Sequence, residues 1–244
     1  MQNDSLDRRS FLKGSALAAA GISVVPRHVL GGPGYQAPSD TLNIAGIGVG
    51  GRATSNMNAL IDENIVAICD VDFEHVDQSL RNQDGKIQDG YKPLKSAYDE
   101  AERYHDFRVM LDEMVDDLDA VVISTPDHVH AAAAKKAMEM GLHVYVEKPL
   151  TRTIREARVL QETAERTGVV TQMGNQGHTH SDGRRAIEWV WAGAIGSVHE
   201  VHAWTDRPAG WWPQGVSRPD DSMPTPDSVH WDLFLGPASG ISYH

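Results

Sequence analysis

Gly46-Ile47-Gly48-Val49-Gly50-Gly51 is the stretch that decides the fold of this 244-residue chain. It follows the apolar run at 42–45 and precedes a segment, 52–61, that we expect to be helical. Glycine allows the tight turn at Gly46, close approach of the backbone to a pyrophosphate at Gly48, and helix–strand packing at Gly51. Free N–H groups at the helix N-terminus then favour phosphates. The pattern predicts a dinucleotide site with contacts from Gly46, Gly48, Val49, Gly50, Gly51 and Arg52.

A carboxylate stands at the end of the next expected strand, 64–70. Asp70 follows Gly51 at about the 20-residue spacing at which such an acid accepts hydrogen bonds from ribose hydroxyls. A carboxylate there would repel a 2′-phosphate, which favours NAD over NADP. Arg52 keeps NADP open as the less favoured cofactor, because a nearby arginine can accept that phosphate.

Strands and helices alternate along the chain from residue 41. Strands are expected at 42–46, 64–70, 119–124, 142–146 and 169–173, with a minor strand near Phe107. Helices are expected at 52–61, 73–82, 96–104, 109–115, 125–140 and 153–168, the last opened by the capping box Thr153-x-x-Glu156. Strands separated by helices imply a parallel sheet. We therefore predict an α/β fold with a Rossmann-type doubly wound sheet over 41–174.

Glu147-Lys148-Pro149 follows the apolar strand expected at 142–146. Ligands bind beyond the carboxyl ends of the strands in a doubly wound sheet, so a lysine there would face the cofactor. Oxidation of an alcohol carbon needs a base for the hydroxyl proton. A lysine can be that base where desolvation or a nearby cation lowers its pKa. We predict that Lys148 is the catalytic proton donor or acceptor, in a turn stiffened by Pro149, with Glu147 at the cofactor. The alternative is a lysine that pairs only with Glu147 or solvent.

Two histidines come directly after Thr125-Pro126, which follows the fourth expected strand. His128 and His130 could indicate a metal site, but zinc needs further ligands that we cannot place in the sequence. Helix capping and shaping of the cofactor edge is the favoured interpretation. We therefore predict cofactor contacts, and no metal, at Thr125, Pro126, His128 and His130.

A polar segment, 175–182, follows the sixth expected strand and should face the same edge of the sheet. It suits a polyol or a sugar, and Gln176 and His178 are the candidate substrate contacts. A solvated loop is an equal alternative, and a His-x-His-x-Asp metal site is a weaker one. We expect 198–205 to be the first strand of a second domain, before a Trp- and Pro-rich stretch that suits either a sugar-binding wall or packing.

The composition excludes several classes of protein. The net charge of −12 argues against nonspecific binding to nucleic acid or to an anionic membrane, because both reward basic patches. The single cysteine, Cys69, excludes an internal disulfide framework and a cysteine-based zinc cluster.

The first residues, 1–38, are expected to be a signal and linker rather than part of the fold. Arg8-Arg9-Ser10-Phe11-Leu12-Lys13 is a twin-arginine pattern, followed by the apolar run 14–26. That run is shorter than the about 20 residues that a membrane-spanning helix needs. We predict export of the folded protein to the periplasm by the twin-arginine machinery. A chance Arg-Arg pair in a disordered tail is the alternative.

Four motifs together resemble the glucose–fructose oxidoreductase, inositol dehydrogenase and rhizopine-catabolism (Gfo/Idh/MocA) family, in particular its twin-arginine-exported members. They are Gly46-x-Gly48-x-x-Gly51, Cys69-Asp70-Val71-Asp72, Thr125-Pro126-Asp127-His128-x-His130 and Glu147-Lys148-Pro149. The resemblance covers about 41–240, including 229–237, which is similar to a segment of the exported subgroup. It implies a Rossmann domain before an α/β domain with a large open sheet, a lysine beside the nicotinamide, backbone contacts to the cofactor at Thr125-Pro126, and oligomers of the full-length chain.

The family's usual histidine, in an Asp-x-x-x-His arrangement, has no counterpart at the expected place. We therefore expect a C-terminally truncated chain whose substrate domain, 175–244, is incomplete. A fragment of a longer protein is favoured over a truncated product.

Three functions remain open. The leading one is an NAD-dependent oxidoreductase acting on a secondary hydroxyl of a sugar or cyclitol. A second is an NAD-dependent glycosidase or lyase that oxidises its sugar transiently, and a third is a noncatalytic nucleotide-binding protein.

Overall fold

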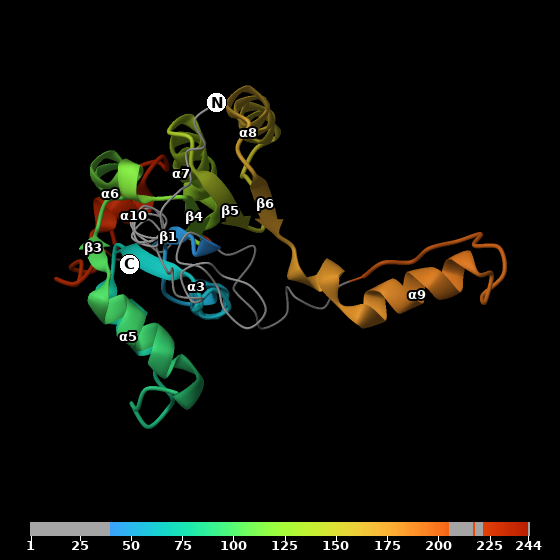
Figure 1. Cartoon of the computed structure of the whole chain (residues 1–244), viewed down its shortest axis with the longest axis horizontal. Coiled ribbons are helices and arrows are strands. Elements are labelled where there is room, and N and C mark those ends of the chain that lie inside the picture. Colours follow the sequence, from blue (N-terminus) through green and yellow to red (C-terminus); the bar gives the residue numbers. More distant parts are fainter. Residues whose placement is uncertain (1–39, 205–216, 218–221, 244) are drawn as a thin grey trace, which may run out of the picture. The chain divides into compact units, whose positions relative to one another are not determined.

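Six parallel strands form one sheet in the order β3-β2-β1-β4-β5-β6 (Figure 1). The computed structural model describes residues 40–204, 217 and 222–243. The strands are β1 Asn43–Ile47, β2 Asn64–Cys69, β3 Glu102–Tyr104, β4 Ala120–Ile123, β5 His143–Glu147 and β6 Thr171–Gly174. The chain changes direction across the sheet between β1 and β4, and doubly wound sheets bind ligands at such a switch point. The predicted Rossmann-type fold is confirmed.

Helices connect successive strands. They are α3 Arg52–Asn58, α4 Phe73–Ser79, α5 Lys92–Glu100, α6 Phe107–Met114, α7 Asp127–Glu139, α8 Ile154–Thr167, α9 Ser181–Trp191 and α10 Trp231–Leu235, with short 3-10 turns η2 Asp89–Tyr91, η3 Val115–Asp117 and η4 Gln176–Thr179. The predicted capping box opens α8, because Thr153 and Glu156 each bond the other's backbone N–H. Gly168 ends this helix with a φ of 73°.

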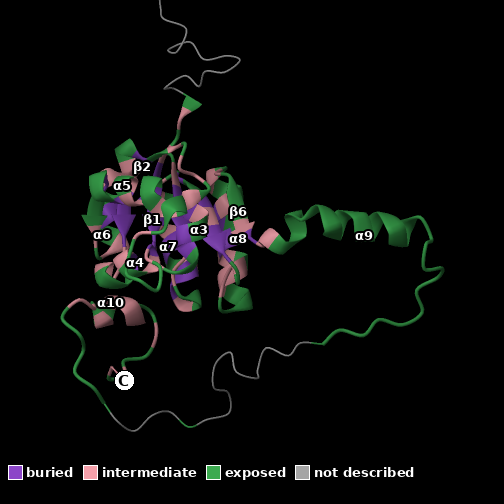
Figure 2. Ribbon diagram, turned by 90° about the horizontal axis from the view of Figure 1, so that it is seen from below, coloured by how far each residue is buried: buried purple, intermediate pink, exposed green. Residues whose placement is uncertain are grey.

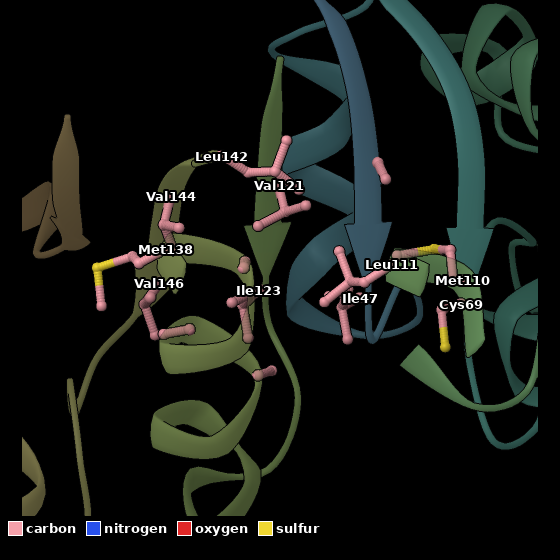
Figure 3. Packing of buried hydrophobic residues seen from close by; sticks show 14 of the residues in the cluster. Ile47, Cys69, Met110, Leu111, Val121, Ile123, Met138, Leu142, Val144 and Val146 are labelled. Atoms are coloured by element: carbon pink, nitrogen blue, oxygen red, sulfur yellow. The ribbon is translucent and has the colours of Figure 1, made fainter. Parts of the chain in front are cut away.

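Alternate residues of the strands enter two apolar cores, as the twofold period of a strand requires. Ile44 of β1 packs with Met57 and Leu94, among the buried side chains of α3, α4 and α5. Its neighbour Ala45 packs with Ala133 and other buried side chains of α6, α7 and α8. Figure 2 shows the buried residues gathered in the sheet and on the helix faces against it, and Figure 3 shows the second core in detail. The central strands are thus buried on both faces, and the carboxyl edge of the sheet is left for ligands.

The minor strand lies earlier than predicted, at Glu102–Tyr104 rather than near Phe107. Asp106 accepts a hydrogen bond from the backbone N–H of Arg108 and caps α6, so Phe107 falls in the first turn of a helix. The helix expected at 96–104 was also misplaced, because α5 begins at Lys92 and ends at Glu100.

The strand expected at 198–205 is not formed. Residues 198–204 are exposed and belong to no strand, and no described strand lies beside them to pair with their backbone groups. The described residues after 174 form η4, α9 and α10 instead. The signal predicted for 1–38 and most of the Trp- and Pro-rich stretch lie outside the described residues. Within the described ranges, no helix is long and apolar enough to cross a membrane.

Candidate functional site

The glycine turn between β1 and α3 packs directly against the turn that follows β4. Gly48 has a φ of 74°, and its N–H donates to the carbonyl of Cys69 at 2.8 Å. A Cβ added at Gly48 would lie 2.8 Å from both the Cα and the N of Thr125. Only glycine meets both conditions, so Gly48 lets the two turns pack backbone against backbone at the carboxyl edge of the sheet.

Asp70, at the end of β2, is tied to the same turn. Its Oδ2 accepts hydrogen bonds from the N–H groups of Val49 at 2.8 Å and Gly50 at 3.3 Å. Its Oδ1 accepts from Asp72 N–H at 3.0 Å. Burial raises the pKa of Asp70 above its ordinary value, although these backbone bonds and His75 act in the opposite direction. The structure thus brings the predicted ribose acceptor and the predicted phosphate turn into contact.

Two side chains of α4, those of Ser79 and His75, also contact the glycine turn, and neither was predicted. Ser79 Oγ accepts the N–H of Gly51 at 2.9 Å. A Cβ added at Gly50 would lie 2.7 Å from Cδ2 of His75, so the imidazole rests on the turn. His75 and Ser79 are four residues apart and share a helix face. The signal in the sequence that could have revealed them was this four-residue spacing in the helix that follows Asp70.

A cavity of about 430 Å³ opens beside Asp70, a volume in the range of small-molecule sites. On one side it is lined by Asp70, Asp106 and Pro126. On the other it is lined by 229–234, including α10, and by Tyr243. A mostly apolar cavity whose lining includes the carboxylates of Asp70, Asp72 and Asp106 suits a planar ring attached to a ribose.

The C-terminal segment is held over the cavity by specific bonds. The backbone N–H of His230 donates to the carbonyl of Val71 at 2.9 Å. His128 Nε2 lies 2.7 Å from the carbonyl of Phe234, and because that oxygen only accepts, Nε2 carries the proton. The rings of Trp231 and Phe234 are stacked, with centroids 4.9 Å apart. Sequence reasoning missed this wall, since nothing local links 229–234 to β2.

Glu147 is the centre of a buried hydrogen-bond network rather than a free carboxylate. Only 4% of it is exposed, and Oε1 accepts from Asn56 Nδ2 at 3.0 Å, Arg52 Nε at 3.3 Å and Gln176 Nε2. Burial opposes its ionisation, but hydrogen bonds from Asn56, Gln176 and Arg52 hold the pKa of Glu147 below its ordinary value. Contact of Glu147 with a cofactor and of Gln176 with a substrate stay predictions, since both side chains are occupied by protein partners here.

Lys148 lies at the carboxyl end of β5, where it was expected, and is exposed. Its backbone N–H donates to Oε2 of Glu147 at 3.2 Å, and its peptide bond to Pro149 is cis. Among the described residues its ammonium group has no hydrogen-bond or ion-pair partner. Pairing of the ammonium with Glu147 is therefore not what the geometry shows, and a lysine that meets only solvent is the alternative left open.

Two other predicted site residues, His130 and His178, are placed by the structure without a clear role at the cofactor edge. His130 is buried between two backbone carbonyls, those of Thr125 and Pro149. His178 lies exposed in η4, and its backbone N–H donates to the carbonyl of Asn175 at 3.0 Å. In the part of the chain that the structure describes, no three His, Cys, Asp or Glu side chains lie close enough to hold a metal.

Asp70 and Lys148 mark two ends of one edge, three strands apart, with the glycine turn between them. Three steps of about 4.8 Å separate them, and a dinucleotide binds across such a crevice. A left-handed glycine at position 48, packed against the turn after β4, and an acid bonded to the same glycine turn place the chain among the dinucleotide-binding Rossmann proteins.

Residues 42–175 match the Gfo/Idh/MocA model, which describes an oxidoreductase family with an NAD-binding Rossmann fold, and the chain belongs to this family. It is 35% identical over 179 residues to a glycosyl hydrolase family 109 protein of Shewanella pealeana, covering 66% of this chain and 38% of that protein. A family 109 protein of Shewanella baltica is 32% identical over 67% of this chain and 38% of its own length. The chain thus matches about two fifths of these relatives.

Solved structures share the fold. Myo-inositol 2-dehydrogenase from Lactobacillus plantarum superposes with a TM-score of 0.50 at 22% identity, covering 65% of this chain and 43% of that one. The WlbA dehydrogenase from Thermus thermophilus, in complex with NAD and alpha-ketoglutarate, gives 0.50 at 22% identity, covering 62% and 47%. At this identity the likeness establishes the architecture alone.

Proposed function

We propose that this chain forms the NAD half of an active site that oxidises or reduces a secondary hydroxyl of a sugar or cyclitol. The observation that carries the proposal is the position of Lys148. It is exposed at the carboxyl end of β5, on the same sheet edge as the glycine turn and Asp70. The chain's membership of the NAD-binding oxidoreductase family supplies the cofactor class.

Each group at the carboxyl edge of the sheet has one role in the proposed reaction. A bound nicotinamide would supply the hydride acceptor or donor. Lys148 takes the proton from the substrate hydroxyl, or returns it, and its ammonium, which has no partner among the described residues, is available for that exchange. Glu147, ionised in its network, holds Arg52 and Gln176 in place beside the lysine turn. The cavity under α10 takes the adenosine, with Asp70 at the ribose.

NAD is the proposed cofactor rather than NADP. Asp70 would repel a 2′-phosphate at the ribose. Arg52 was the residue that kept NADP open, but its Nε is bonded to Glu147 at 3.3 Å, on the β5 side of the edge. The only guanidinium of the glycine turn is thus held away from the β2 side.

Glycoside cleavage through transient oxidation of the sugar is the second candidate. It is favoured by the names of the two Shewanella relatives, both glycosyl hydrolases. The same Lys148 would serve both reactions, and they differ in their products. An oxidoreductase accumulates NADH with a free sugar, whereas a glycosidase releases the aglycone with no net NADH.

The test is Lys148→Ala in the protein expressed from its complete coding frame, with Lys135→Ala as the matched control. Lys135 is partly exposed and pairs with Glu139 on α7, so its loss removes a surface charge only. Turnover should fall by about 10²–10⁴-fold in Lys148→Ala and stay unchanged in the control. NAD affinity should be nearly equal in both. Near-normal turnover in Lys148→Ala would overturn the proposed role.

A further inference from the structure

His130 makes two hydrogen bonds that a neutral imidazole cannot make together. It lies on α7 and is 1% exposed. Its Nδ1 is 2.7 Å from the carbonyl oxygen of Pro149, and its Nε2 is 2.8 Å from the carbonyl oxygen of Thr125. Both partners are backbone carbonyls, which accept hydrogen bonds and never donate them.

A neutral histidine carries one N–H, so one ring nitrogen would direct its lone pair at a carbonyl oxygen. Only the imidazolium donates from both nitrogens. Both distances are those of good N–H···O bonds, and bonds from a charged donor are the stronger kind. We propose that His130 is a doubly protonated positioning residue that joins the cofactor turn to the lysine turn.

The two carbonyls belong to the turns that matter most at this edge. Thr125 supplies the backbone atoms against which Gly48 packs, so its position sets the width of the site beside the glycine turn. Pro149 directly follows Lys148. One ring therefore fixes the spacing between the cofactor contact surface and the proposed catalytic lysine. This positioning role rests on the proposed function of Lys148, whereas the charge state of His130 does not.

The charge state can be measured in the unmodified protein. The chain is labelled with ¹⁵N-histidine, and the His130 signals are assigned by their loss in His130→Gln. At neutral pH both ring nitrogens should show the shift of a protonated nitrogen, each with its own one-bond proton coupling. A single coupled nitrogen, with the other at the far-downfield shift of an unprotonated one, would overturn the proposal. That result is expected if the ring is rotated so that carbon atoms face the carbonyls.

The positioning role is tested with His130→Phe and His130→Gln in the full-length protein. The phenyl ring keeps the bulk and neither bond, whereas the glutamine amide can keep one. His143→Gln is the control, because His143 lies at the opposite end of β5 and accepts only from Val170 N–H. We expect kcat to fall by about 100-fold in His130→Phe, by less in His130→Gln, and not in the control.

A purely structural role would give another pattern. Both His130 variants would then lose thermal stability while kcat, measured well below the melting temperature, stayed at the value of the unmodified protein, and that outcome would overturn the positioning role. If Lys148→Ala also kept its turnover, the proposed function would fail, and a doubly protonated His130 in the spectrum would still stand.

Discussion

Gly48→Ala is the sharpest perturbation that the structure offers, because a matched control has nearly the same positive φ. Gly48 and Gly85 have φ values of 74° and 76°. A Cβ at Gly48 would lie 2.8 Å from backbone atoms of Thr125, whereas a Cβ at Gly85 would meet nothing within 4 Å. The two substitutions therefore share the strain of a left-handed residue and differ in the steric clash.

The magnitudes follow from these two terms. A left-handed conformation costs an L-residue about 1–2 kcal/mol, which both variants bear. Forcing a methyl group into a well-packed contact costs about 1–3 kcal/mol more, and only Gly48→Ala bears that cost. The free energy of unfolding should therefore fall by roughly 2–5 kcal/mol in Gly48→Ala and by roughly 1–2 kcal/mol in Gly85→Ala.

Urea unfolding followed by circular dichroism measures both values, and a titration with NAD measures the site. NAD affinity should fall in Gly48→Ala, since the added methyl group pushes the turn of Thr125 away, and should be unchanged in Gly85→Ala. Equal losses of stability in the two variants would refute the steric argument. Unchanged NAD affinity in Gly48→Ala would refute the assignment of this turn to the cofactor.

Three further predictions concern charge and export. The pKa of Glu147 is lowered in the fold, so its ionised form should contribute fully to stability above the ordinary pKa of 4.5. That contribution should disappear as the pH falls through the lower pKa of the folded state. Urea unfolding should therefore give free energies for the unmodified protein and for Glu147→Gln that converge in acid. Asp70→Asn should raise NADP affinity relative to NAD by roughly tenfold, measured by parallel titrations, because a repelling charge is removed; an unchanged ratio would contradict the role of Asp70. Replacing Arg8 and Arg9 by lysine should leave the full-length protein in the cytoplasm on fractionation, and undiminished export would exclude the twin-arginine route.

Local patterns were enough to predict the half of the site that lies close in sequence. Gly46 to Gly51 needed only a strand before it and a helix after it, and Asp70 needed only the expected spacing. Lys148 was found because the apolar strand before it is unmistakable. Each of these signals lies within one strand–turn–helix unit, whose geometry short-range sterics and hydrogen bonds determine.

Predictions failed where a residue depends on partners that local patterns do not reveal. The strand near Phe107 was misplaced because the cap at Asp106 outweighs a weak apolar signal. The expected strand at 198–205 has a strand-like alternation but no described neighbour to pair with. The cofactor contact of Glu147 stays a prediction, but its bond to Arg52 spans 95 positions and could not be read from a local pattern.

The sequence by itself determined the order of strands and helices, the parallel sheet, the glycine turn and the place of Lys148 at its edge. Only the tertiary structure decided what surrounds that edge. It laid 229–234 over the cavity beside Asp70, occupied Glu147 with Arg52 and Gln176, and set His130 between two carbonyls. The physical reason is the range of the interactions: turns and periodicity act over a few residues, whereas the satisfaction of buried polar groups depends on which distant segments the folded chain brings together.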